Sequence, residues 1–326
     1  MRENVDVFFQ DPPPEVDTLF VIDNSGSMQA YQLFLGLRFN DFLTWFDRAG
    51  VDYRIAVTTT TVETPPYLPQ GCTQQDVDAA PAPGHLNLDT VIAPDTPDAE
   101  SVFADIVHVG TCGDGNRESG LQASRLALSP ELLSGANAGF LREDASLSVI
   151  YVSDEQDYST DPVYLYTNDL YAAKGARSRD VVNADAMVIT DPTDCIIPLA
   201  ASSEGSRYVA IADQTGGVTS NLCNQDFSQA MVELSFNASR MHDEFVLTDL
   251  PATDTLEVSV GGERVPCTSG QWTYALRDTG DGSQQAVIVF DRERIPQPGA
   301  RIAVRYDYGD GDPANFCPAA AVVGAP

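Results

Sequence analysis

The sequence predicts an α/β domain with a doubly wound, mostly parallel sheet, followed by a small C-terminal β-sandwich-like domain. Over residues 15–238, short apolar runs that suit buried strands alternate with stretches of helical periodicity. Over residues 239–326, strand-like segments follow one another without intervening helices. A chain of 326 residues, 43% of them hydrophobic, can bury two cores of this kind. We therefore expect two domains, preceded by an extended lead at residues 1–14.

The first predicted elements form a strand–helix–strand unit. The lead ends in Pro12-Pro13-Pro14, which cannot continue a helix or a central strand. Residues 16–22 are almost continuously apolar, as in a parallel strand that is covered on both faces. Residues 28–49 carry apolar side chains at helical spacing, and the β-branched segment 53–60 returns as a strand. This βαβ unit predicts a right-handed crossover in a parallel sheet.

The alternation resumes after a proline-rich insertion at about residues 62–97, which we expect to be a long surface excursion. In the rest of the first domain, the residue pattern predicts helices near 98–107, 118–128 and 163–173 and strands at 146–152 and 186–190. It also predicts a last unit, which runs through 208–212, the Gly216-Gly217 turn and a helix near 227–236. The second domain predicts strands at 256–260, 285–290 and 301–306, which indicates a compact, turn-rich β fold.

The net charge excludes one large class of partner. The chain has 48 acidic and 18 basic residues, which gives a formal charge of -30. A nucleic-acid backbone would be repelled over most of such a surface. We therefore expect no nucleic-acid partner, and we interpret the scattered acidic residues as a solvated surface.

The six cysteines indicate disulfides and an exported protein. None of them forms a CxxC pair or has the close Cys/His spacing of a zinc site. Six cysteines allow 15 pairings, and we expect neighbours to pair: Cys195 with Cys223, Cys267 with Cys317, and Cys72 with Cys112. Disulfides persist in oxidising compartments, so we expect an extracytoplasmic location. Because the chain begins without an apolar signal segment and has no run of about 18 apolar residues, we expect a removed signal peptide and no transmembrane segment.

Hard oxygen donors follow the first predicted strand. Asp23, Ser25 and Ser27 occupy alternate positions on the turn before the next helix, where open parallel sheets bind their ligands. One carboxylate and two hydroxyls suit a small hard cation such as Mg²⁺. The same string also suits an ordinary helix N-cap, because Asp and Ser are preferred there. The apolar strand before it and the amphipathic helix after it favour the metal site.

The segment Asp23-Asn24-Ser25-Gly26-Ser27 resembles the DxSxS metal-ion-dependent adhesion site (MIDAS) of von Willebrand factor A (VWA) and integrin I domains. The resemblance covers residues 16–237 and implies a Rossmann-like fold. It also implies that a threonine and an aspartate from two later loops complete the site, at Thr111 and Asp154. The family's usual Thr-Asp-Gly is Ser-Asp-Glu here, and a Cys-Gly-Asp-Gly insertion follows Thr111. The metal implied is Mg²⁺, with Mn²⁺ or Ca²⁺ as alternatives.

This resemblance implies a metal-dependent adhesion module, whose cation would take an exposed glutamate or aspartate of a protein partner as its last ligand. The alternative is a structural or assembly subunit of a surface apparatus, in which the metal only stabilises the loops. The chain also resembles exported surface proteins or lipoproteins of Gram-negative bacteria. That likeness implies a secreted, cell-surface or outer-membrane location and a lipid anchor on the precursor.

Catalysis is the least supported function. The sequence has no GxSxG segment, and its three histidines belong to no close metal motif. Metal-assisted hydrolysis would need a base beside the cation, and Glu155 and Asp157 are the only candidates near Asp154. We therefore expect that the protein is not an enzyme.

Overall fold

The computed structural model consists of two compact units. One is Pro13–Ser239, and the other joins Met1–Pro12 to Arg240–Pro326. We call them the α/β unit and the β unit and describe each by itself. The structure describes residues 3–11, 15–63, 72–79, 81–87, 91–113, 117–175, 178–195, 203–223, 227–280 and 282–317.

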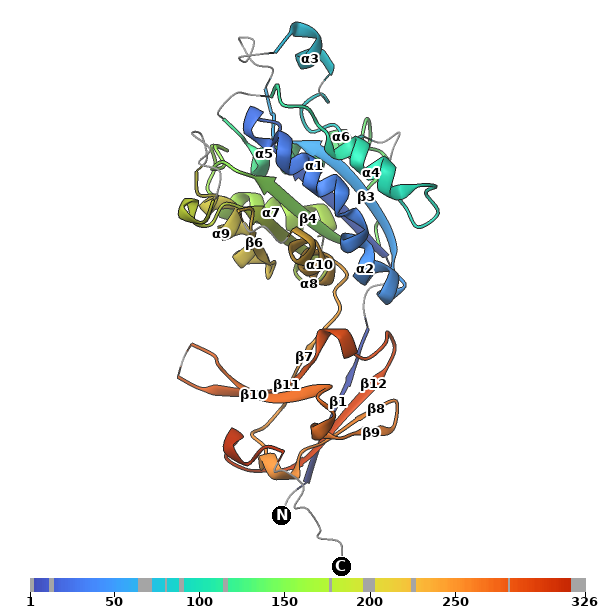
Figure 1. Ribbon diagram of the computed structural model, residues 1–326, viewed down its shortest axis with the longest axis vertical. Helices are drawn as coiled ribbons and strands as arrows, with labels where there is room; N and C mark the ends of the chain where they lie inside the picture. The colour runs from blue at the N-terminus through green and yellow to red at the C-terminus, as the bar shows by residue number, and fades with distance from the viewer. Residues whose placement is uncertain are drawn as a thin grey trace, which may run out of the picture. The chain divides into compact units, whose positions relative to one another are not determined.

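A five-stranded parallel sheet forms the centre of the α/β unit (Figure 1). Its strands are β2 (Glu15–Ile22), β3 (Asp52–Thr59), β4 (Ser146–Ser153), β5 (Val182–Val188) and β6 (Thr219–Asn221). The order across the sheet is β3-β2-β4-β5-β6, and every neighbouring pair runs parallel. Every residue of β4 and β5 is buried, as expected of central strands covered on both faces. The predicted doubly wound parallel sheet is therefore confirmed.

Helices pack against both faces of this sheet. The described helices are α1 (Gln29–Leu37), α2 (Phe39–Ala49), α3 (Gln74–Ala79), α4 (Ala99–Val107), α5 (Gly120–Ala127), α6 (Pro130–Leu133), α7 (Val163–Lys174), α8 (Ser178–Val181), α9 (Ser206–Thr215) and α10 (Phe227–Ala238). Leu19 and Val21 of β2 join a buried cluster with residues of α5, α7 and α9. Phe20, which lies between them, contacts Phe42 of α2 and Phe103 of α4, with ring centroids 5.2 and 5.3 Å apart. Successive residues of β2 therefore build two separate cores.

Three predicted elements differ from the structure. The strand expected at 186–190 is β5, which begins at Val182 and ends at Val188. The helix expected at 28–49 is divided at Arg38, between α1 and α2. The segment 208–212, expected in the last βα unit, lies inside α9. The buried residues of α9 are spaced by three and four positions, as on one helix face: Tyr208, Ile211, Ala212 and Thr215. The strand of that unit is β6, which follows the Gly216-Gly217 turn.

Near its C-terminal end, the proline-rich insertion pairs with the edge strand β3 of the sheet. Ile92 forms an isolated antiparallel bridge with Ile55 of β3. The backbone N–H of each residue donates to the carbonyl oxygen of the other, at 2.8 and 2.9 Å. The helix α3 is the other regular element among the described residues of the insertion.

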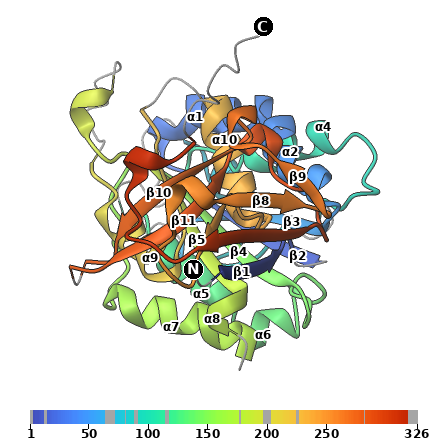
Figure 2. The same ribbon diagram turned by 90° about the horizontal axis from the view of Figure 1, so that it is seen from below.

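Two antiparallel sheets form the β unit. Its strands are β1 (Glu3–Phe9), β7 (Glu244–Val246), β8 (Glu257–Val260), β9 (Glu263–Val265), β10 (Trp272–Asp278), β11 (Gln284–Phe290) and β12 (Arg301–Asp307). One sheet has the order β1-β12-β8-β9 and the other β10-β11-β7, and Figure 2 shows β8 and β9 side by side. Phe8 of β1 contacts Phe245 of β7 with ring centroids 5.4 Å apart, which joins the two sheets. The predicted small β-sandwich-like fold is confirmed.

The first strand of the β unit comes from the N-terminal lead. Residues 3–9 pair with β12 along their whole length, from Glu3 opposite Asp307 to Phe9 opposite Arg301. The carboxylate of Asp6 accepts hydrogen bonds from Tyr306 Oη (2.7 Å) and from the backbone N–H of Thr248 (2.9 Å). The β unit is thus discontinuous along the chain, and the expected domain range 239–326 holds all of its strands except β1.

All three expected disulfides are present: Cys72–Cys112, Cys195–Cys223 and Cys267–Cys317. Disulfides fit a protein of an oxidising, extracellular environment. In the part of the chain that the structure describes, no helix is long and apolar enough to cross a membrane.

Candidate metal site

Asp23 is held between the ends of two central strands. It follows β2, is fully buried, and its backbone N–H donates to Val152 O of β4 over 2.9 Å. One carboxylate oxygen accepts from the backbone N–H of Ser25 (2.7 Å) and the other from the Ser153 hydroxyl (2.6 Å). These bonds fix the turn that carries the DxSxS segment.

The Ser27 hydroxyl contacts both the Ser25 hydroxyl and the Asp154 carboxylate. Ser25 Oγ is 3.1 Å from Ser27 Oγ, and Ser27 Oγ donates to Asp154 Oδ1 over 3.0 Å. Asp154 directly follows β4, which pairs with β2 in the sheet. The ends of two adjacent strands therefore bring four of the five predicted residues together, the fourth being Asp23.

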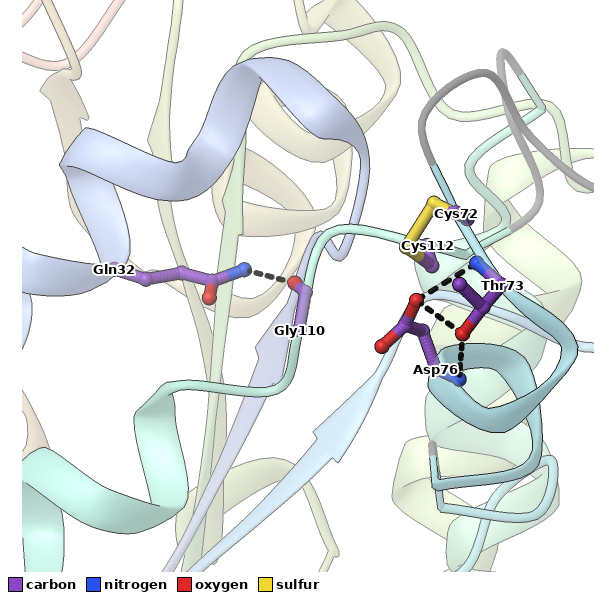
Figure 3. Close-up of a disulfide and its surroundings, with 6 residues drawn as sticks. All are labelled: Gln32, Cys72, Thr73, Asp76, Gly110 and Cys112. Atoms are coloured by element: carbon purple, nitrogen blue, oxygen red, sulfur yellow. Dashed lines mark hydrogen bonds between the residues drawn. A yellow bond between two sulfur atoms is a disulfide. The ribbon is translucent and has the colours of Figure 1, made fainter.

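Thr111 lies on a loop that is tied to this turn on both sides. Gln32 of α1 is buried, and its Nε2 donates to Asp23 O (3.0 Å) and to Gly110 O (2.8 Å), as Figure 3 shows for the second bond. On the other side, the backbone N–H of Gly113 donates to Asn24 O over 3.0 Å. A Cβ at position 113 would collide with the Asn24 side-chain amide, so a larger residue there would require this amide to move.

Thr111 lines a neighbouring cavity of about 490 Å³, together with Asp76, Asp105 and His108. Within the described residues it makes no hydrogen bond to the other four predicted residues. Next to it, Cys112 is joined to Cys72 just before α3, as drawn in Figure 3. The structure therefore brings the Thr111 loop to the site but leaves the role of this hydroxyl as a prediction.

Three carboxyl groups share the site with little access to water. Burial raises the pKa of Asp23. Burial, together with the charge of Asp23, raises the pKa of Asp154 to about 7. Burial and the charges of Asp23 and Asp154 also raise the pKa of Glu155 to about 7. Burial is the main cause in all three groups, and repulsion between neighbouring negative charges adds to it for Asp154 and Glu155. A cation among these groups would relieve that repulsion.

The donor atoms fit a divalent cation. Asp154 Oδ2 is buried and has no hydrogen-bond partner among the described residues. Ser25 Oγ, Ser27 Oγ and the Asp154 carboxylate are hard oxygen donors, the kind that Mg²⁺ and Ca²⁺ prefer. No three His, Cys, Asp or Glu side chains of the described ranges are grouped so that they could hold a metal. The serine hydroxyls would therefore have to supply part of the coordination shell.

Two further polar side chains, those of Gln32 and Ser153, form hydrogen bonds to the site, and the sequence indicates them only weakly. Gln32 is a buried polar residue in a helix that is otherwise apolar on its buried side. Ser153 is the last residue of β4, and its hydroxyl donates to Asp23 while accepting the backbone N–H of Glu155 over 3.0 Å. Neither residue belongs to the five that the motif indicates.

Of the two residues considered as a catalytic base, Asp157 forms hydrogen bonds that connect neighbouring elements of the fold. Its carboxylate accepts hydrogen bonds from Arg207 Nε (2.9 Å), Ser159 Oγ (2.7 Å) and the backbone N–H of Leu121 (3.1 Å). These bonds tie the loop after β4 to α5 and α9. Glu155 lies beside the site and is buried.

The chain matches no protein-family model and no curated protein. It is similar to the solved structure of proximal thread matrix protein 1 (PTMP1) from the mussel byssus with a zinc-occupied MIDAS motif, at 16% identity over 73% of this chain and 48% of that one, with a TM-score of 0.41. It is also similar to the pilus adhesin SpaC from Lactobacillus rhamnosus GG, at 12% identity over 93% of this chain and 41% of that one, with a TM-score of 0.42. The chain thus spans less than half of either protein. Neither match supports the Gram-negative source that the resemblance implies.

Proposed function

We propose that the protein is a VWA-type, metal-dependent protein-binding module that acts outside the cytoplasm. The observation that carries this proposal is the contact of Ser25, Ser27 and Asp154 at the ends of β2 and β4. Asp23 would help to hold the cation, and Thr111 would complete the site from its tethered loop. Mg²⁺ is the proposed ion, because the donors are hydroxyl and carboxylate oxygens.

The proposed site reaches the surface. Gly26 is exposed and Ser27 is half-buried, so a partner can approach the donors from solvent. A bound cation keeps exchangeable positions, and a glutamate or aspartate of the partner supplies the anionic oxygen that such an ion prefers. The charge of -30 does not prevent this, because exposed charges are screened beyond about 8 Å at physiological salt.

Tyr31 offers a second contact on the rim. It lies on α1 and stacks on Phe227, with ring centroids 6.1 Å apart. Burial and the charge of Asp154 raise the pKa of the Tyr31 phenol, so this group stays neutral at physiological pH. A neutral phenol O–H at that place can donate a hydrogen bond to a partner carboxylate.

A peptide-display selection in the presence of Mg²⁺ tests the proposal. We expect retained peptides to contain an Asp or Glu that is essential for binding, and we expect chelator to release them. The Asp154→Asn variant, which keeps the side-chain shape but loses the charge, should retain none of them. Retention that survives both chelator and Asp154→Asn would rule the proposal out. If Mg²⁺ raises the melting temperature but no peptide is retained, the structural or assembly alternative is favoured.

A further inference from the structure

The strand β1 forms an open edge of the β unit. In the sheet order β1-β12-β8-β9 it is an end strand, so β12 is the one described strand that pairs with it. The backbone N–H of Gln10 donates to Ala300 O, on the β12 side, over 3.0 Å. Backbone groups alternate in direction along an antiparallel strand, so those of Val5, Val7 and Phe9 point away from β12. A further strand can therefore pair with β1 on this side.

The side chains at the same three positions form an exposed apolar row. Val5 is 43% exposed, Val7 is 42% exposed and Phe9 is 57% exposed. The intervening Asp6 and Phe8 point into the β unit, where Asp6 is hydrogen-bonded and Phe8 packs against a ring of β7. An edge strand with an exposed apolar face is a template on which another chain can pair.

The other edge strands of the β unit are protected against such pairing. The strands β7 and β9 have three residues each, and β9 exposes the charged side chains of Glu263 and Arg264. The strand β10 has seven residues, as β1 does, but its exposed residues are Thr273, Arg277 and Asp278. Short strands and exposed charges are the usual means by which proteins prevent edge pairing. After its first residue, the exposed row of β1 has neither protection.

An antiparallel pairing of two β1 strands matches this apolar row with itself. With a two-fold axis at Val7, this residue lies opposite Val7 of a second copy, and Val5 lies opposite Phe9 of that copy. All three cross-strand pairs are then apolar, and pairs of this kind stabilise a sheet. Both copies use the same surface, as a two-fold dimer requires. The sheets of the two copies become one continuous sheet.

The charge distribution also permits the approach of a second copy at this edge. The formal charge of the chain is -30, but the four strands of this sheet carry five acidic residues and three arginines. Arg305 lies opposite Val5 on β12 and pairs with Glu3 over 3.0 Å. The two-fold pairing brings Asp11 of the second copy opposite Glu3, beside Arg305. One arginine therefore compensates both carboxylates at each end of the paired strands.

We propose that β1 is a dimer interface, at which two copies of this chain pair antiparallel through their edge strands. The inference is independent of the proposed function, because β1 belongs to the β unit and its pairing needs no cation. A dimer joins two candidate metal sites in one assembly, which strengthens attachment to a surface that repeats a ligand.

Sedimentation equilibrium of the whole chain, in the presence of chelator, tests the proposal. We expect a dimer with a dissociation constant of about 100 µM or tighter, since one strand pair makes a small interface. Val7→Lys places two like charges opposite each other at the axis and should weaken the dimer by about 30-fold or more. The matched control is Val246→Lys on β7, where the valine is 41% exposed, and it should leave the dimer unchanged.

A covalent cross-link gives a second measurement that does not depend on a charged variant. Directly opposed residues of an antiparallel pair have Cα atoms about 4.5–5.5 Å apart, which suits a disulfide. Oxidised Val7→Cys should therefore form a covalent dimer, whereas Val246→Cys, with the same change at an equally exposed valine, should remain monomeric on a denaturing gel.

Several outcomes overturn the inference. One is a parent chain that stays monomeric at several times the expected dissociation constant, and another is an equal loss of dimer in Val7→Lys and Val246→Lys. A dimer that forms with Mg²⁺ and dissociates with chelator also overturns it, because the contact would then depend on the cation. If Val7→Lys fails to fold, the absence of a covalent Val7→Cys dimer decides against the inference. None of these results bears on the proposed function, which fails if Asp154→Asn binds Mg²⁺ like the parent.

Discussion

Ser27 Oγ donates a hydrogen bond to Asp154 Oδ1 over 3.0 Å, although the two residues are 127 positions apart in the chain. The parallel pairing of β2 with β4 creates this contact, because the carboxyl ends of both strands lie at one edge of the sheet. The other oxygen of Asp154 is buried without a hydrogen-bond partner among the described residues. The hydrogen bond from Ser27 thus engages one oxygen of Asp154 and leaves the other oxygen able to bind a cation.

Adding Mg²⁺ should therefore stabilise the α/β unit. A ligand at 100 times its dissociation constant contributes about 2.7 kcal/mol to folding, which corresponds to a rise in melting temperature of roughly 5–10 °C for a unit of this size. The rise can be followed by the fluorescence of Trp45, which belongs to this unit, in a Trp272→Phe background. Chelator should reverse it. An equal melting temperature with and without Mg²⁺ would contradict the metal site.

Replacing Ser27 by alanine should reduce that rise. The change removes one hard donor and the hydrogen bond to Asp154, so we expect the Mg²⁺ affinity to fall by about tenfold or more, an effect of the size seen when the support of a metal ligand is lost. The matched control is Ser101→Ala, on the exposed side of α4, which should leave the Mg²⁺ response unchanged. Isothermal titration with Mg²⁺ measures both variants. The same affinity in the two variants would remove Ser27 from the site.

The sequence predicted these contacts because they rest on local patterns. The strand at 16–22 and the polar turn after it are adjacent in the chain, so a short motif is enough to indicate them. Asp154 follows the strand at 146–152 in the same way. Parallel strands then place both turns at the same edge.

What the sequence did not predict depends on packing between distant segments. The buried Glu118 carboxylate accepts a hydrogen bond from the Thr60 hydroxyl, 58 positions away, and no local pattern indicates this contact. The pairing of β1 with β12 joins residues at opposite ends of the chain, and nothing in the lead itself identifies its partner strand. The apolar residues at 208–212 fit a strand and a helix equally well, since periodicity in so short a segment does not separate them. The long-range fold decides each of these cases.

Removing the Cys72–Cys112 disulfide should destabilise the α/β unit and weaken its metal binding. The bond closes a loop with a sequence separation of 40, which in the chain-entropy model contributes about 3–4 kcal/mol. It also ties Cys112, the neighbour of Thr111, to the segment before α3. We expect the variant in which serine replaces both Cys72 and Cys112 to unfold at a lower urea concentration. It should also bind Mg²⁺ severalfold more weakly.

The Cys267–Cys317 bond gives the matched control. It has a similar sequence separation, 50, but lies in the β unit. Its double serine variant should lower the stability of the β unit without changing the Mg²⁺ affinity. If the two variants affect Mg²⁺ binding equally, the Cys72–Cys112 disulfide beside Thr111 does not contribute to the metal site.

Arg142 neutralises a fully buried carboxylate at the opposite end of the sheet. Its Nε donates to Asp17 Oδ1 over 2.7 Å, and its backbone N–H donates to Asp17 Oδ2 over 2.6 Å. The Arg142 side chain is 13% exposed and that of Asp17 is 0% exposed. An Arg142→Met change should therefore cost about 3–5 kcal/mol at neutral pH, because it removes the positive charge that directly contacts a buried carboxylate. Arg264→Met, which breaks the exposed pair with Glu257, should cost less than about 1 kcal/mol.

The loss of unfolding free energy in Arg142→Met should be smaller at low pH than at neutral pH. Burial already raises the pKa of Asp17 even though Arg142 lowers it, so removing Arg142 should raise this pKa further. A carboxyl group whose pKa is higher in the folded state favours folding when it is protonated, and this advantage is lost as the pH rises through the folded-state pKa. The unfolding free energy of Arg142→Met, measured in urea, should thus approach that of the parent as the pH falls toward 4. The double variant Asp17→Asn with Arg142→Met should remove the pH dependence that the single variant adds. A loss of equal size at pH 4 and pH 8 would show that Arg142 acts by packing and not by charge.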